Sequence, residues 1–211
     1  LTAAYIDSVR LNAGAVSVRR DGAGAWVRDA TGEAQRYDHV VIATHANEAL
    51  AMLDDASSAE RTLLGAFAYT KNRAVLHTDA ALMPKRRPQW SSWNYVGENP
   101  EGGCVVSYWM NKLQGIQSQE QIFLTLNPRA MPRAGTVLYE TEYEHPLFNA
   151  AAIRAQEQLW SLQGVRNTWF CGAHFGAGFH EDGLQAGLAV APVSQHMFGQ
   201  PDQGLLVLNI G

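Results

Sequence analysis

The sequence contains little cysteine, little net charge and no long apolar run. Its 211 residues include two cysteines, 16 Lys+Arg and 20 Asp+Glu, for a formal net charge of −4. Cys104 and Cys171 lie far apart without a pairing motif, which excludes a disulfide scaffold and favours a cytoplasmic protein. No apolar stretch reaches the roughly 18 residues that a membrane span requires. The acidic balance argues against nucleic acid as a partner.

The first 45 residues have the pattern of β-structure. Hydrophobic residues make up 46% of the chain, enough for a substantial core. Val16 and Val18 alternate with polar neighbours, and turn-forming residues follow at 21–24 and 30–33. The run at 40–42, Val-Val-Ile, does not alternate. It therefore predicts a strand buried on both faces, as in a parallel sheet.

The remaining elements are predicted from helix-capping residues and from residues that end helices and strands. Ser57 and Glu60 have capping-box spacing, which predicts a helix that ends at Gly65. Asn149 is expected to cap a second helix that ends near residue 163. The region between these helices predicts a second sheet, with candidate strands at 72–77, 90–95, 104–110, 121–126 and 136–143. Together these patterns indicate an α+β fold.

A strand, a glycine-bearing loop and a helix follow one another in residues 168–191. Glycines 176 and 178 let backbone N–H groups approach a ligand, and the helix N-terminus adds unpaired donors. The neighbouring acids disfavour phosphate there, which leaves a neutral acceptor such as a ring carbonyl. The alternative is an ordinary strand-to-helix connection whose acids complement the helix dipole. We expect Leu184, Leu188 and Ala191 to form the apolar face of this helix, and Pro192 to end or kink it.

The segment TWFCGAHFGAGFHEDGLQAGLAVA (168–191) resembles the C-terminal flavin-contacting motif of FAD-dependent amine oxidoreductases. The resemblance is greatest to a bacterial subgroup of predicted NAD/FAD-binding proteins. Segment 37–50 is similar to the strand that closes the β-meander of the FAD-binding domain. Segments 72–95 and 108–115 are similar to the substrate-side sheet of that subgroup.

The resemblance implies a partial FAD/NAD(P)-binding domain, a mixed-sheet substrate domain of the flavin amine oxidase type, and a set of site residues. The implied domains are a β-meander at 1–45, a substrate domain at 46–165, a flavin-contact unit at 166–191 and a tail at 192–211. The implied FAD-binding residues are Gly172, Ala173, Gly178, Phe179, the backbone N–H of His180, Glu181, Asp182 and Thr44. The implied substrate-pocket residues are Phe179, Trp93 and Tyr108.

The chain departs from the family in two places. Flavoproteins of this type hold the ADP half of FAD with a G-x-G-x-x-G turn, which these 211 residues do not contain. Asp182 stands where the family's motif has a small residue. We therefore expect the distal half of an oxidoreductase that moves a hydride from a C–N or C–C bond of a small molecule to flavin. This piece would be inactive alone and would bind FAD weakly or not at all.

Other interpretations stay open at this point. The chain could be a non-catalytic binding or assembly module derived from a flavoenzyme, or it could form a homodimer through an exposed flavin-facing surface. His174 and His180 match no zinc-binding spacing, so no metal is expected. Cys171 has the character of a core residue, and no side chain is identifiable as catalytic. For Trp93 and Tyr108, packing in a sheet core is the alternative to lining a pocket.

Overall fold

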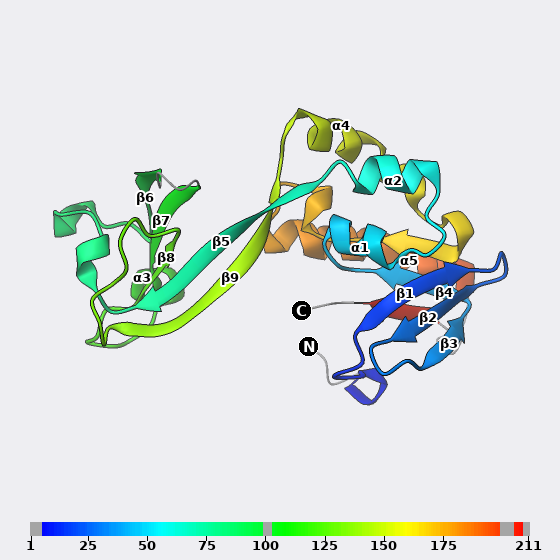
Figure 1. Ribbon diagram of the computed structural model, residues 1–211, viewed down its shortest axis with the longest axis horizontal. Coiled ribbons are helices and arrows are strands. Elements are labelled where there is room, and N and C mark those ends of the chain that lie inside the picture. The colour runs from blue at the N-terminus through cyan, green and yellow to red at the C-terminus, as the bar shows by residue number, and fades with distance from the viewer. Residues whose placement is uncertain (1–5, 99–102, 199–204, 209–211) are drawn as a thin grey trace. The chain divides into compact units, whose positions relative to one another are not determined.

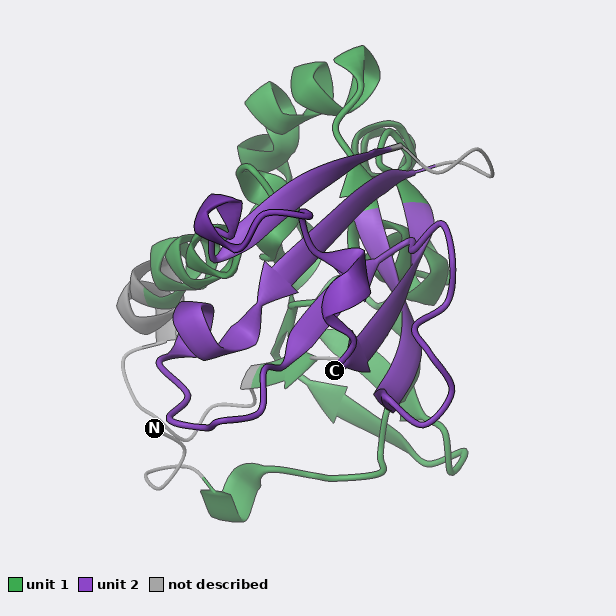
Figure 2. Ribbon diagram, turned by 90° about the vertical axis from the view of Figure 1, so that its left-hand side faces the viewer, with its two compact units in different colours: residues 1–69, 146–211 green, residues 70–145 purple. Residues whose placement is uncertain are grey.

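The computed structural model describes residues 6–98, 103–198 and 205–208, without the side chains of 98, 192–198 and 205. The chain forms two compact units (Figure 2). The first unit combines residues 1–69 with 146–211, and the second consists of residues 70–145. This division differs from the expected 46–165 segment, because the helices near both ends of that segment pack into the core of the first unit.

The first unit contains an antiparallel meander, a parallel sheet and helices (Figure 1). Its strands are β1 (Ala15–Arg20), β2 (Ala25–Asp29), β3 (Ala34–Tyr37), β4 (His39–Ile42), β10 (Thr168–Phe170) and β11 (Leu205–Leu208). Its α-helices are α1 (Ala46–Met52), α2 (Ser58–Leu64), α4 (Ala150–Leu159) and α5 (His180–Phe198). Its 3₁₀ turns are η2 (Ile6–Ser8), η5 (Trp160–Leu162), η6 (Val165–Asn167) and η7 (Ala173–Phe175).

Strand β4 is the centre of the parallel sheet, whose order is β10-β4-β11. Val40 and Ile42 pack into a core with α1, α2, α4 and the meander, whereas Val41 faces the other way. Val41 packs with Trp169, Cys171 and two residues of α5. Strand β4 is therefore buried on both faces, as its unbroken apolar run predicted.

Helix α5 packs on the sheet through a different face from the expected one. Ala186 and Val190 are buried, whereas Leu184 and Leu188 are 56% and 54% exposed. Small side chains suit the buried position because the bulky Trp169 already fills that layer. The helix also continues through Pro192 to Phe198. Pro192 has no backbone N–H to donate to the carbonyl of Leu188, four residues earlier. That carbonyl lies on the exposed side of α5, where water can donate a hydrogen bond to it.

Residues 192–211 are not simply a tail. They include the last turns of α5 and strand β11, which pairs in parallel with β4, Leu206 opposite Val40. A sheet edge presents unpaired backbone N–H and C=O groups, and an apolar strand satisfies them while it adds Leu208 to the core. The short run 205–208 carried no turn or alternation signal that would have revealed this pairing.

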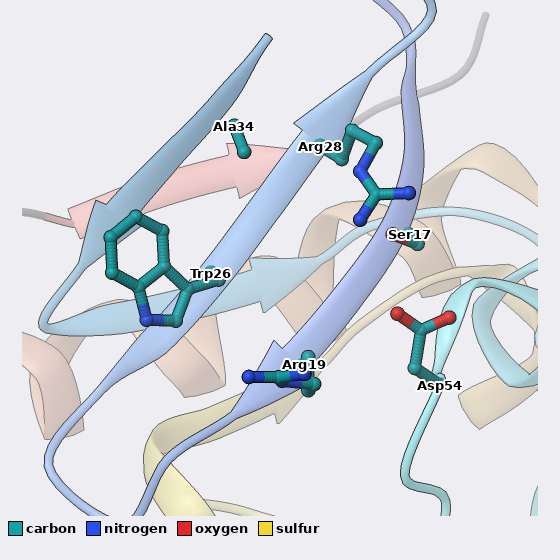
Figure 3. Close-up of a pocket in the computed structure, with 6 residues that line it drawn as sticks. All are labelled: Ser17, Arg19, Trp26, Arg28, Ala34 and Asp54. Carbon is teal, nitrogen blue, oxygen red and sulfur yellow. The ribbon is translucent and has the colours of Figure 1, made fainter. Parts of the chain in front are cut away.

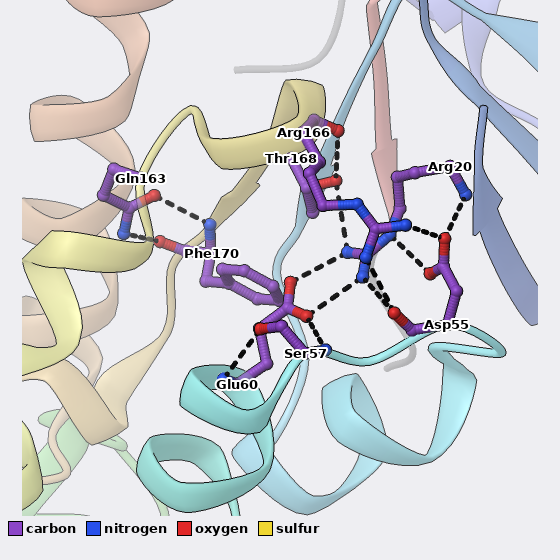
Figure 4. A network of polar contacts seen from close by, with 8 residues as sticks. All are labelled: Arg20, Asp55, Ser57, Glu60, Gln163, Arg166, Thr168 and Phe170. Carbon is purple, nitrogen blue, oxygen red and sulfur yellow. Dashed lines mark hydrogen bonds and ion pairs between the residues drawn. The ribbon is translucent and has the colours of Figure 1, made fainter. Parts of the chain in front are cut away.

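The predicted caps are present. Ser57 and Glu60 form the capping box of α2, and Gly65 follows its last turn. Asn149 caps α4 by accepting hydrogen bonds from two backbone N–H groups. Arg20, fully buried on β1, contacts Asp55, Glu60 and Thr168, and so joins the meander to α2 and β10 (Figure 4).

The second unit is built on a five-stranded sheet of order β6-β7-β8-β5-β9. Strands β5 and β9 run side by side as long ribbons (Figure 1). The strands are β5 (Ala68–His77), β6 (Trp93–Glu98), β7 (Cys104–Trp109), β8 (Phe123–Leu126) and β9 (Val137–Leu147). The helical elements are α3 (Met110–Gln114), η3 (Ala80–Leu82) and η4 (Arg87–Gln89). Each of the five predicted strands is present, although β6 begins at Trp93, three residues later than predicted.

A chain of buried hydroxyls and one imidazole crosses three strands of this sheet. His77 Nε2 lies 2.8 Å from Thr125 Oγ1, which lies 2.8 Å from Ser107 Oγ. Because the Asp79 N–H donates to His77 Nδ1, the imidazole must donate from Nε2. Burial lowers the pKa of His77, which keeps it neutral.

Over the described ranges, none of the helices combines the length and apolar character that a bilayer crossing requires.

Candidate functional site

The carboxyl ends of β4 and β10 lie together because the two strands are parallel, with Phe170 opposite Ile42. Their continuations meet at Thr44 and Gly172. A Cβ on Gly172 would lie 3.1 Å from the Thr44 carbonyl oxygen and 2.9 Å from the His174 ring. Gly172 also has φ 151°, a conformation that side chains disfavour. In open α/β sheets ligands bind outside the carboxyl ends of strands, so this edge is the candidate site.

Helix α4 holds the loop that follows Gly172. The side-chain amide of Gln156 donates to the carbonyl oxygens of His174 (2.9 Å) and Gly176 (2.6 Å). The loop is also tight at Gly178, which has φ 95° and whose Cβ would approach Phe148 to 2.9 Å. The glycines are thus required by close packing within the loop. Gln156 carried no signal in the sequence, because its role depends on a contact 18 to 20 residues away.

At the start of α5, several backbone N–H groups that were expected to face a ligand bond within the turn itself. The Phe179 N–H donates to Asp182 Oδ2 (2.8 Å), and the N–H groups of Asp182 and Gly183 donate to the Phe179 carbonyl. Asp182 therefore caps this helix, which gives it a structural role where the resemblance implied a cofactor contact. Glu181 accepts a hydrogen bond from Gln185. The Phe179 side chain is 71% exposed, and His180 is exposed as well.

Three polar atoms beside this edge are buried without a hydrogen-bond partner in the described part of the chain: His174 Nε2, Asn47 Oδ1 and His45 Nδ1. His174 is 3% exposed and packs against the rings of Phe67 and Phe175. Asn47 lies in the first turn of α1, which starts directly beyond β4. An unmade hydrogen bond at a buried atom costs about 1–3 kcal/mol, so such atoms suggest a missing ligand or water. None of these three residues was in the predicted cofactor set.

Two buried titratable groups of the site, His174 and Cys171, have pKa values that keep them neutral at physiological pH. Burial and the nearby His45 lower the pKa of His174 to about 4. Burial raises the pKa of the Cys171 thiol to about 11, which makes it an inert core residue. The structure thus brings together Thr44, Gly172, Ala173 and His174, all with uncharged side chains. Such a surface can bind a polar, uncharged ring edge better than an isolated ion.

The two aromatic residues predicted for a substrate pocket, Trp93 and Tyr108, lie opposite each other on β6 and β7 of the second unit. Trp93 is 61% exposed, so it is not a core residue of that unit. The neighbouring Trp109 points to the other face, where it packs edge-on against Trp90 and donates to Gln121. Phe179 belongs to the first unit.

The fold is of a mixed helix-and-sheet class that recurs in oxidases. Putrescine oxidase matches with a TM-score of 0.62 and 14% identity over 92% of this chain and 50% of that chain. Cyclohexylamine oxidase from Brevibacterium oxydans matches with 0.60 and 13% over 92% and 50%. The CLA-producing fatty acid isomerase from P. acnes matches with 0.59 and 14% over 88% and 47%.

The chain therefore spans about half the length of the solved structures that it matches. At these identities the likeness establishes the fold. No protein-family model matches the sequence, and no curated protein matches it.

Proposed function

We propose that the chain is the flavin-facing half of an FAD-dependent oxidoreductase. The observation that carries the proposal is the pair of unpartnered buried atoms, His174 Nε2 and Asn47 Oδ1, beside the strand edge where Thr44 meets Gly172. The likeness of the fold to two amine oxidases supports it. The chain covers about half of each of those two chains, which agrees with the proposal that it is one half of a longer protein.

The residues at this edge fit a flavin. Gly172 lets the backbone come close, and Asn47 Oδ1 can accept a hydrogen bond that no described residue donates to it. His174 stays neutral above a pKa of about 4, so it can donate or accept at Nε2. Thr44, Gly172, His174 and Asn47 would hold the cofactor here. When bound, FAD would supply the hydride acceptor, and these residues would orient it and exclude water.

The substrate class remains part of the proposal. Putrescine oxidase and cyclohexylamine oxidase are named for amines, which favours a C–N bond over a C–C bond as the bond oxidised. The exposed Trp93 and the adjacent Tyr108 would offer an apolar surface for the carbon skeleton. No charged acid or base is required from this chain in that arrangement.

Titration of FAD into the full chain, followed by flavin fluorescence and visible absorbance, tests the proposal. We expect weak but saturable binding, and we expect Gly172→Ala to reduce the affinity by about tenfold because its Cβ would enter the space between Thr44 and His174. Gly187→Ala is the matched control, since a Cβ there meets nothing within 4 Å. Circular dichroism would verify that both variants fold. Saturable binding with equal affinities for the two variants would overturn the proposal.

A further inference from the structure

The outer face of the meander carries a second hollow, separate from the candidate site. A pocket of about 210 Å³ is lined by Ser17, Arg19, Trp26, Arg28, Ala34 and Asp54 (Figure 3). The strand register explains why these residues share one face. Ser17 lies opposite Arg28 and Arg19 lies opposite Trp26, whereas Val18 and Val27 point into the core.

Two arginines of this pocket form no ion pair within the described part of the chain. The side chains of Arg19 and Arg28 are exposed, and neither makes a hydrogen bond or ion pair with any residue that the structure describes. The other two arginines at this part of the meander are both paired: Arg20 with Asp55 and Glu60, and Arg36 with Asp21 and Asp38. Like charges on adjacent strands repel each other, so an anion bound between Arg19 and Arg28 would relieve that repulsion.

Trp26 adds an aromatic surface to the same face. Its side chain is on the solvent side of β2 and is 42% exposed. The indole Nε1–H donates to Asp21 Oδ2 (3.2 Å), which holds the ring in place. A fixed, exposed indole can stack on a planar ring with little loss of side-chain freedom. Asp54 supplies the only carboxylate among the lining residues.

We propose that this face binds a small ligand with a phosphate group beside a planar aromatic ring, the chemistry of a mononucleotide. Arg19 and Arg28 would bind the phosphate oxygens, and Trp26 would stack on the ring. Asp54 would weaken the binding of a dianion by repulsion, so its removal should improve affinity. The inference does not rest on the proposed flavin site, because the two share no residue.

Titration of adenosine monophosphate into the full ¹⁵N-labelled chain at low ionic strength tests this proposal. The indole N–H signal of Trp26, assigned by comparison with Trp26→Phe, should shift and saturate. Arg19→Gln and Arg28→Gln should each weaken binding by about tenfold, and Asp54→Asn should strengthen it severalfold. Arg154→Gln, which removes an exposed charge from α4, is the matched control and should bind as the native chain does.

Further titrations separate the parts of the ligand. Inorganic phosphate and adenosine should each bind more weakly than adenosine monophosphate. Phosphate that binds equally well, or no saturable shift at Trp26, would overturn the proposal. So would binding that is lost in Gly172→Ala but kept in Arg28→Gln, since the nucleotide would then occupy the flavin site. Binding of a single-stranded oligonucleotide without binding of the mononucleotide would also overturn it.

Discussion

Arg20 and Glu60 form a buried, bidentate ion pair, with Nη1–Oε1 and Nη2–Oε2 distances of 2.9 and 3.0 Å. Arg20 lies on β1, Glu60 in the first turn of α2, and Arg20 Nη1 also reaches Thr168 Oγ1 on β10 at 3.5 Å. Asp55, which binds Arg20, is also paired with Arg166 just before β10. The pair therefore links the meander to the strand that leads into the glycine loop (Figure 4).

We expect Glu60→Gln to destabilise the chain by about 3 kcal/mol, because it leaves the buried Arg20 with less compensation. Glu33→Gln, an exposed change of the same kind, should cost about 0.5 kcal/mol or less. Urea unfolding followed by circular dichroism measures both. Similar free energies of unfolding for the two variants would show that the ion pair contributes little.

Gln156 should control the rigidity of the glycine loop. Gln156→Leu removes both hydrogen bonds to the loop carbonyls of His174 and Gly176 and should cost about 1–3 kcal/mol. Because the loss is local, amide hydrogen exchange should accelerate at Phe175 and Gly176, whose N–H groups close the turn η7. Gln158→Leu, on the exposed side of α4, is the control and should leave exchange in the loop unchanged.

His174 should make stability depend on pH. Burial lowers its pKa in the folded chain from 6.5 to about 4, so folding keeps it neutral. The contribution of His174 to the free energy of unfolding is therefore fully present above pH 6.5. As the pH falls from about 6.5 to 4, the free energy of unfolding decreases by up to about 3 kcal/mol, because the unfolded chain binds a proton that the folded chain does not. In His174→Phe that loss should be absent, because phenylalanine does not bind protons.

The measurement is the difference in unfolding free energy between His174→Phe and the native chain at several pH values. Other groups, such as Glu60 and His77, titrate in both proteins and cancel in the difference. For Glu60, burial opposes ionisation, but hydrogen bonds from Arg20 and Ser57 outweigh it and lower its pKa, so its contribution is lost only at still lower pH. A difference that does not change between pH 7 and pH 4 would contradict the role assigned to His174.

Local patterns predicted the secondary structure well because the interactions that form it are local. The capping box of Ser57 and Glu60 and the cap at Asn149 each depend on residues within three positions of one another. The apolar run of β4 indicated burial on both faces because a polar residue on either face would be costly there. Pairing of β11 with β4 was not predictable in this way, since it joins segments more than 160 residues apart.

The local structure around the candidate site was predictable, whereas the cofactor-binding roles of its residues stay predictions. Residues 168–191 indicated a strand, a glycine loop and a helix, and the structure places Thr44 beside Gly172 at one edge of the sheet. The same pattern did not show that Asp182 would bond the Phe179 N–H, nor that α5 would bury Ala186 in place of Leu184. These outcomes depend on which side of the helix meets Trp169.

The amino-acid sequence alone indicated most of the strands and helices, the glycine-bearing loop between residues 172 and 178, and a core large enough to fold. Tertiary structure alone decided that, among the described residues, His174 Nε2 and Asn47 Oδ1 are buried without partners and the side chains of Arg19 and Arg28 stay unpaired around one pocket. The reason is physical: propensities and caps act over a few residues, whereas the satisfaction of a polar atom depends on groups that only long-range packing brings near.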